Sequence, residues 1–194
     1  MKTLIKNGLV VDPANLVQTH LNLLLEDGKI VAVTEEEPEA DRVIDAAGKV
    51  VAPGFIDIHM HEDPVKDDKI QFCIFDAMLR MGVTTAVGGN CGINVYDPVK
   101  YLDLLERDGA PVNVMMFAGH QYYRETAGAL DKYSPVTEEQ RKTMKKGLEE
   151  ALEAGCVGIS YGLRYVPGTG REEFLDTASC CQKEHRLISA HVRD

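Results

Sequence analysis

The sequence is short of basic residues: Lys and Arg total 21 against 31 Asp and Glu, giving a formal net charge of −10. No stretch gathers positive charge, and an acidic chain repels phosphate backbones, so we expect no nucleic-acid partner. No apolar run approaches the roughly 18–20 residues that span a bilayer, and the first residues carry no signal-peptide core. These absences predict a soluble, cytoplasmic protein that does not enter membranes.

The cysteines form no recognisable disulfide or zinc-knuckle framework. They are odd in number, irregularly spaced and without a CxxC pair, which is typical of a reducing compartment. The chain does have enough length for a sizeable core, since 194 residues with 44% hydrophobic and 27% charged side chains are typical of a globular protein. The five cysteines are Cys73, Cys91, Cys156, Cys180 and Cys181.

Residues 1–51 show short apolar runs without helical periodicity, which predicts a small β-subdomain. Residues 4–11 are interrupted by Asn7-Gly8, the commonest short hairpin signal. A second hairpin is predicted from residues 21–25 to residues 30–33. Two further short strands flank the turn at residues 46–48.

From residue 52 to residue 194 the pattern alternates between β-branched runs and segments with apolar residues at helical spacing. It predicts five strands with four intervening helices, and a long polar loop at residues 119–135. A capping box at residues 137–140 begins a helix whose buried stripe is Met144, Leu148 and Leu152. Repeated βα units with buried parallel strands predict either a doubly wound sheet or a (β/α)8 barrel.

Five polar residues stand at or just past the ends of the predicted strands: His59, His61, Cys91, His120 and His191. In a barrel those ends face one mouth, where barrel enzymes carry their catalytic groups. The two histidines at residues 59 and 61 are separated by one residue on an extended segment, so both point to the same side and can reach one metal ion. His20 and His185 lie outside the pattern and are predicted to be surface residues.

The segment at residues 52–62 (APGFIDIHMHE), after a β-subdomain that opens with IKNGLVVDP, resembles the start of an amidohydrolase-superfamily enzyme. Further along, GNCG at residues 89–92, Gly119-His120, GISYGL at residues 158–163 and HVRD at residues 191–194 resemble the N-acyl-D-amino-acid deacylase family, in that family's order. The resemblance implies an α/β fold: a partial (β/α)8 TIM-type barrel of about five βα units, preceded by the small β-subdomain and incomplete at its C-terminus.

The resemblance also implies a metal site. His59 and His61 would bind one metal position, Cys91 would replace the bridging carboxylated lysine of other superfamily members, and His191 would bind the second position. Thiolate and imidazole ligands favour zinc, as one or two ions. Asp57 shares a face with His59 and either orients that ligand or turns the strand.

Three further residues are predicted to contact a substrate. His120 either touches the reacting carbonyl or hydrogen-bonds its own backbone. Arg164 and Tyr165, on a loop at the mouth, could hold a substrate carboxylate through hydrogen bonds, with Arg193 as a weaker candidate. The family usually has an apolar residue where Arg164 stands, which leaves the substrate class open.

The function implied is zinc-dependent hydrolysis of the amide bond of N-acyl-D-amino acids or related amides, in which the metal polarises the carbonyl and activates water. In the resembled family another histidine ligand comes from the sixth strand and the general-base aspartate from the eighth. Both are expected beyond residue 194, and Asp194 is not taken as the base. We therefore expect an N-terminal part of a larger enzyme, with little or no activity by itself.

Two alternatives stay open. A cyclic-amide hydrolase of the dihydroorotase or hydantoinase kind shares the β-subdomain and the HxH pair, but it would supply a bridging lysine at a strand end, and none stands there. A non-catalytic metal-binding or assembly module could instead complete its sheet with another chain, because a five-stranded piece leaves edge strands exposed. The expected partners are a small-molecule amide and, in a homo-oligomer, further copies of the chain.

Overall fold

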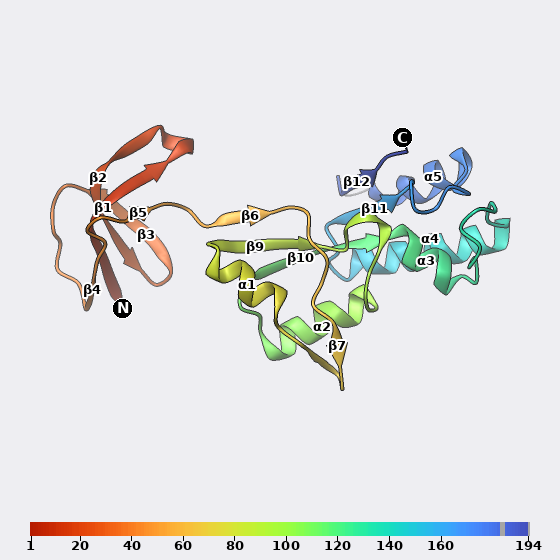
Figure 1. Cartoon of the computed structure of the whole chain (residues 1–194), viewed down its shortest axis with the longest axis horizontal. Helices are drawn as coiled ribbons and strands as arrows, with labels where there is room; N and C mark the ends of the chain where they lie inside the picture. Colours follow the sequence, from red (N-terminus) through yellow and green to blue (C-terminus); the bar gives the residue numbers. More distant parts are fainter. Residues whose placement is uncertain (183–184, 194) are drawn as a thin grey trace. The chain divides into compact units, whose positions relative to one another are not determined.

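Figure 1 shows the computed structural model, which describes residues 1–182 and 185–193. The chain separates into two compact units, Met1–Gly54 and Phe55–Asp194. Asp194, which is not expected to be the general base, lies outside the described residues. No helix in the described part combines the length and hydropathy needed to cross a bilayer.

The first unit is a five-stranded sheet in the order β3-β2-β1-β4, with β5 also paired to β1. The first three strands form an antiparallel meander, and β4 and β5 run parallel to β1. Leu4, Val10 and Leu23 are buried in it. Its elements are β1 (Lys2–Asp12), η1 (Pro13–Asn15), β2 (Val17–Glu26), β3 (Lys29–Thr34), β4 (Arg42–Asp45) and β5 (Val50–Val51).

The predicted hairpin at Asn7-Gly8 is wrong, because β1 runs straight through that dipeptide. Asn7 does adopt the left-handed conformation that Asn-Gly favours, with φ 64°, but it forms a bulge in the pairing of β1 with β2. The chain turns instead at η1, where the Asp12 side chain accepts the N–H of Ala14 and Pro13 occupies the first turn. The second predicted hairpin, between β2 and β3, is confirmed.

The second unit contains a five-stranded sheet in the order β12-β11-β10-β9-β6, and every neighbouring pair is parallel. The strands lie in chain order, without the reversal that a doubly wound sheet requires. The unit is therefore an open, curled part of a (β/α) barrel, as predicted. Its strands are β6 (Phe55–Asp57), β7 (Val65–Lys66), β8 (Lys69–Ile70), β9 (Val83–Gly88), β10 (Asn113–Gly119), β11 (Gly158–Gly162) and β12 (Leu187–His191).

The helices pack on one face of this sheet, with α1 against β9 and α2 against β10 (Figure 1). Two elements differ from the sequence prediction: a short hairpin, β7–β8, follows β6, and the predicted polar loop after β10 begins with helix α3. The helical elements are α1 (Ile74–Arg80), η2 (Asn90–Gly92), α2 (Pro98–Asp108), α3 (His120–Thr126), α4 (Glu138–Glu153), α5 (Arg171–Ala178) and η3 (Ser179–Cys181).

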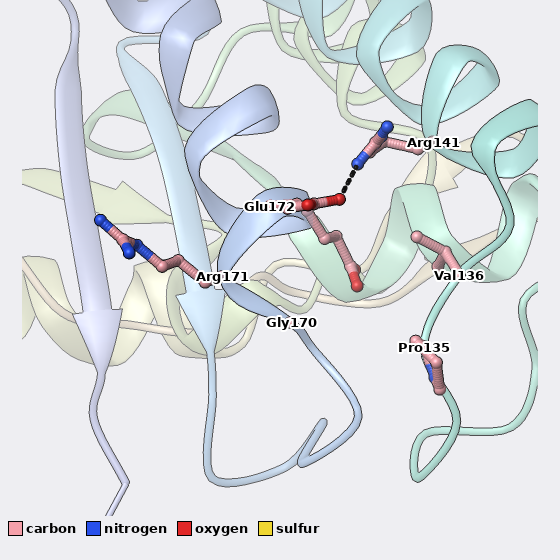
Figure 2. Close-up of a pocket in the computed structure, with 7 residues that line it drawn as sticks. Pro135, Val136, Arg141, Gly170, Arg171 and Glu172 are labelled. Atoms are coloured by element: carbon pink, nitrogen blue, oxygen red, sulfur yellow. Dashed lines mark hydrogen bonds and ion pairs between the residues drawn. The ribbon is translucent and has the colours of Figure 1, made fainter.

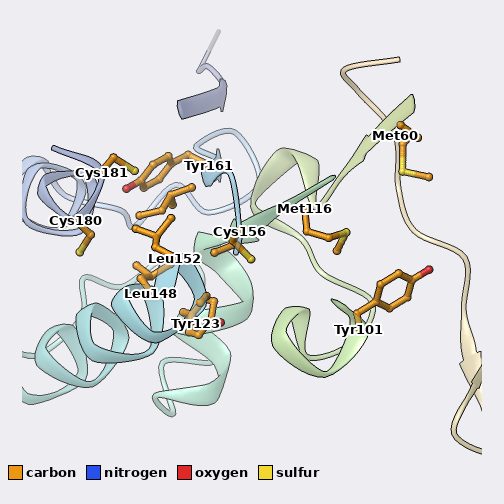
Figure 3. Packing of buried hydrophobic residues seen from close by; sticks show 14 of the residues in the cluster. Met60, Tyr101, Met116, Tyr123, Leu148, Leu152, Cys156, Tyr161, Cys180 and Cys181 are labelled. Carbon is orange, nitrogen blue, oxygen red and sulfur yellow. The ribbon is translucent and has the colours of Figure 1, made fainter. Parts of the chain in front are cut away.

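The core of the second unit lies between the strands and the helices (Figure 3). The predicted stripe on α4 is confirmed, since Met144 and Leu148 are fully buried and Leu152 is 5% exposed. The predicted capping box is also confirmed: the Thr137 side chain accepts the N–H of Gln140, whose side chain reaches back to Thr137. The buried apolar side chains of the helices and the strands thus pack together in this one core.

Candidate metal centre

The HxH pair continues the first strand of the barrel-like sheet. Beyond β6 the chain bends at His59 and returns to the neighbouring strand at Met60, which donates its N–H to the Val87 carbonyl at 3.3 Å. Met60 is buried while His59 and His61 on either side of it are exposed. The Asp57 carboxylate accepts the backbone N–H of His59 at 3.0 Å, so Asp57 shapes the turn after the strand rather than touching an imidazole ring.

Cys91 projects from a tight turn after β9. It lies within η2 with φ 59°, flanked by Gly89 (φ 72°) and Gly92 (φ 77°), so three residues of the turn adopt left-handed backbone angles. Glycine adopts such angles at little cost, whereas a residue with a Cβ resists them. The thiol is 6% exposed, and burial raises the pKa of the Cys91 thiol.

The thiol of Cys91 lies between imidazoles from two different strands. Its Sγ is 3.4 Å from Nε2 of His59 and 3.7 Å from Nδ1 of His191. Tetrahedral zinc, with bonds of about 2.3 Å to sulfur and 2.05 Å to nitrogen, separates such ligand atoms by about 3.6 Å. The donor atoms present therefore fit zinc in both chemistry and spacing.

The ligand atoms fall into two overlapping sets. Those of His59, His61 and Cys91 all lie within 4.8 Å of one another, a spacing that allows one ion to be held. His191, at the end of β12, contacts the thiol but is not a member of that group. Cys91 is thus the atom that the two sets share.

Tyr165 lies beside His191. Its hydroxyl is 3.1 Å from His191 Nδ1, and the two rings meet edge to face with centroids 4.8 Å apart. Arg164 is exposed on the same loop. Arg193 donates to the carbonyls of Pro167 and Thr169 at 3.1 and 2.6 Å, so it holds the backbone of this loop, a contact that differs from the expected one with a substrate carboxylate.

His120 is not brought to the cluster around Cys91. It begins α3, is fully buried, and stacks on Tyr161 with ring centroids 4.9 Å apart. Its Nε2 meets Oε1 of Glu173 at 2.8 Å, and Arg124 donates to the same oxygen at 2.7 Å. Although burial favours a neutral carboxyl, the bonds from these two residues hold the pKa of Glu173 below its usual value. A contact between His120 and a substrate is therefore still only a prediction, and the burial of the ring against Glu173 and Tyr161 does not support it.

Glu173 also lines a cavity of about 220 Å³ at the start of α5 (Figure 2). In that cavity Arg141 donates to Glu172 at 3.3 Å, while the Arg171 side chain points away from Glu172. None of the predicted metal ligands lines it. The cavity therefore belongs to the helical layer and not to the cluster around the thiol.

Comparison with known proteins agrees with this geometry. The sequence profile of the amidohydrolase family matches residues 42–165. The N-acyl-D-glutamate deacylase of Alcaligenes xylosoxydans xylosoxydans is 31% identical over 215 residues, which is 98% of this chain and 43% of that protein. The chain thus spans less than half the length of the relatives it matches.

Solved structures agree as well. The N-acyl-D-glutamate deacylase of Bordetella bronchiseptica, crystallised with zinc and a phosphonate mimic of the tetrahedral intermediate, has a TM-score of 0.84 and 30% identity over 99% of this chain and 45% of that one. A D-aminoacylase described as having a binuclear metal centre gives a TM-score of 0.86 at 27% identity over 99% of this chain and 45% of that one. From its sequence profile, its relatives and its fold, the chain belongs to the amidohydrolase family.

Proposed function

We propose that this chain forms the first part of a zinc-dependent amidohydrolase that cleaves the amide bond of N-acyl-D-amino acids or a closely related amide. The observation that carries the proposal is the Cys91 thiol, which lies 3.4 and 3.7 Å from imidazole nitrogens at the ends of two strands. The deacylase relatives act on N-acyl-D-amino acids by name, and one of them was crystallised with zinc.

The residues take distinct roles in this proposal. His59, His61 and Cys91 hold one ion, and Cys91 and His191 share in holding a second where one is present. Zinc held by these residues would act as a Lewis acid on the scissile carbonyl and would lower the pKa of a bound water toward neutrality. Tyr165, with its hydroxyl at His191, and Arg164 on the same loop lie where a substrate carboxylate can be held through charge-assisted hydrogen bonds.

The ligand group among the described residues contains two histidines and a cysteine but no carboxylate. General-base catalysis needs a group that takes the water proton and passes it to the leaving amine. We therefore propose that the 194-residue chain binds zinc and by itself turns over little or no substrate. The matched deacylase is longer than this chain, and in our proposal the base comes from the part of such an enzyme that this chain does not span.

The cyclic-amide alternative has less support. It requires a bridging lysine, and no lysine stands at the carboxyl end of β6, β9, β10, β11 or β12 in the described chain. A cytoplasmic location and the absence of nucleic-acid or membrane partners are further proposals, supported by the net charge of −10 and by five cysteines that the structure describes as free thiols. A homo-oligomer is proposed because apolar side chains on both edge strands are exposed, Phe55 and Ile188 among them.

Zinc binding by purified variants tests the proposal. We expect the chain, after metal depletion and reloading, to hold one or two zinc ions, measured by emission spectrometry after gel filtration. Cys91→Ser should lower zinc affinity at least tenfold, because a hydroxyl is a far poorer zinc ligand than a thiolate. Cys73→Ser is the matched control, since Cys73 lies outside the ligand group and its contact is a hydrogen bond to Asp63 at 2.9 Å that a hydroxyl can also make.

Two results would contradict the proposal. Equal zinc affinity in the Cys91 and Cys73 variants would remove the thiol from the site. A stable oligomer that takes up no zinc would favour the assembly module. Measurable zinc-dependent hydrolysis of N-acyl-D-amino acids by the chain alone would overturn only the expected inactivity.

A further inference from the structure

The segments that carry the proposed ligands meet at one buried amide. Asn90 is 1% exposed, and its Nδ2 donates to the carbonyl of Ile58 at 3.2 Å, directly before His59. Its Oδ1 accepts the hydroxyl of Ser189 at 3.4 Å, two residues before His191. One side chain, itself adjacent to the cysteine, thus contacts the strand of each flanking histidine.

A second buried side chain bridges the turn that presents Cys91. Ser160, on β11, is fully buried, and its Oγ accepts the N–H of Gly92 at 2.9 Å. The same hydroxyl donates to the carbonyl of Gly89. Cys91 stands between these two glycines with φ 59°, a conformation that is unfavourable for a residue with a Cβ and persists only where its surroundings impose it. A hydroxyl can accept and donate at a single atom, which suits it to bridge both ends of the turn.

We propose that Asn90 and Ser160 are positioning residues that hold the Cys91 thiol and the flanking histidines in ligand geometry before the metal binds. This inference rests on the proposed function, because it requires Cys91 to be a metal ligand. Groups that orient metal ligands without touching the metal typically contribute 10–100-fold to metal affinity. Neither residue contacts a substrate in this proposal, so their effect is exerted through the thiol.

The test compares metal binding by variants of the whole 194-residue chain. Ser160→Ala removes both hydrogen bonds to the turn and should weaken zinc binding about 10–100-fold, measured by competition with a chromophoric chelator. With cobalt(II) in place of zinc, its thiolate-to-metal charge-transfer band should shift or lose intensity, because the thiol is no longer held at one angle. Asn90→Asp keeps the size of the side chain but replaces the N–H donor with a carboxylate oxygen, and it should weaken binding in the same way.

The control removes a buried hydroxyl that does not touch the turn. Thr177, on α5, is fully buried, and its Oγ1 donates to the carbonyl of Glu173 at 2.8 Å. Thr177→Val should lower the unfolding midpoint without changing zinc affinity or the cobalt spectrum, which separates positioning from general destabilisation.

The results distinguish the two proposals. If Cys91→Ser keeps the charge-transfer band of the unaltered chain, the thiol is not a ligand and the proposed metal site fails. If Cys91→Ser loses the band, but Ser160→Ala and Asn90→Asp keep the affinity and spectrum of the unaltered chain, only the positioning proposal is overturned. If Ser160→Ala does not fold, Asn90→Asp decides the matter by the same two measurements.

Discussion

At the scale of single residues, the buried carboxyl group of Glu62 should make the stability of the chain depend on pH. The side chain is 3% exposed, and its Oε1 accepts an N–H of Asn94 at 2.8 Å. Burial raises the pKa of Glu62 above its usual 4.5, and the bond from Asn94 only partly offsets this. The folded chain therefore keeps a proton that the unfolded chain has released, and the free energy of unfolding should fall as the pH rises from about 4.5 toward the raised pKa.

Glu62→Gln tests this linkage. Glutamine can still accept from Asn94 but cannot ionise, so the variant should lose the fall in stability and be more stable than the unaltered chain at pH 7, by about 1.4 kcal/mol for each unit of the pKa shift. Urea unfolding at a series of pH values, in the presence of a chelator, measures the difference. Glu153→Gln, at an exposed position, should leave the pH profile unchanged. A Glu62→Gln profile parallel to that of the unaltered chain would show that Glu62 does not carry the effect.

His120 shows why the direction of a side chain cannot always be predicted from its position at the end of a strand. The alternation of side chains predicts direction only while the backbone stays extended. The backbone bends at His59, yet the ligand atoms of His59 and His61 lie within 4.8 Å of each other, as the HxH spacing predicted. After Gly119 the chain turns at once into α3, so the helix sets the direction of His120, and its ring lies against Tyr161.

At the scale of elements, helix α1 depends on a residue well before its start. The residue at its N-cap position, Cys73, makes no side-chain capping hydrogen bond. Instead the fully buried carboxylate of Asp63 accepts the N–H groups of Cys73, Ile74 and Phe75 at 3.1, 2.8 and 3.0 Å. These are three of the donors that a helix leaves unpaired at its N-terminus.

Asp63→Asn should therefore destabilise α1 selectively. Only one amide oxygen can accept, so at least one buried N–H is left facing the amide NH₂ group. We expect a loss of about 2 kcal/mol in the free energy of unfolding, from an unsatisfied buried donor and a weaker acceptor. Hydrogen exchange should show faster exchange across residues 74–80. Asp103→Asn, on the exposed face of α2, is the control, and equal effects of the two variants would argue against the cap.

The elements also show which sequence signals were sufficient to locate a helix or a turn. Apolar periodicity with a capping box located α4 correctly, because both signals are local and agree. The Asn7-Gly8 signal is equally local, but Leu4 and Val10 on either side of it are both buried along one strand. Pairing with β2 therefore turned the local preference into a bulge. GNCG predicted Cys91 as a ligand through resemblance, and the structure places its thiol near His59 and His191. Ser160, which hydrogen-bonds the turn that carries Cys91, lies 69 residues further along the chain, so no local pattern pointed to it.

At the scale of the second unit, the proposed metal ligands come from the two edges of the sheet. His59 and His61 follow β6, one edge strand, and His191 ends β12, the other. Contact of a single thiol with His59 and His191 requires the sheet to curl until the ends of its edge strands converge. An ion held there binds only the curled form, so it should stabilise that form through linkage.

Zinc should therefore raise the unfolding temperature and do so through the second unit. At a free concentration 100 times the dissociation constant, a single ion contributes about 2.7 kcal/mol, equivalent to a shift of about 5–10 °C for a chain of this size. His191→Ala should reduce the shift, whereas His20→Ala, in the first unit, should not. Hydrogen exchange should slow in β6 and β12 on zinc addition and stay unchanged in β1, because every ligand lies after residue 54. Equal slowing in both units, or a full thermal shift in His191→Ala, would show that zinc does not act by joining the edge strands.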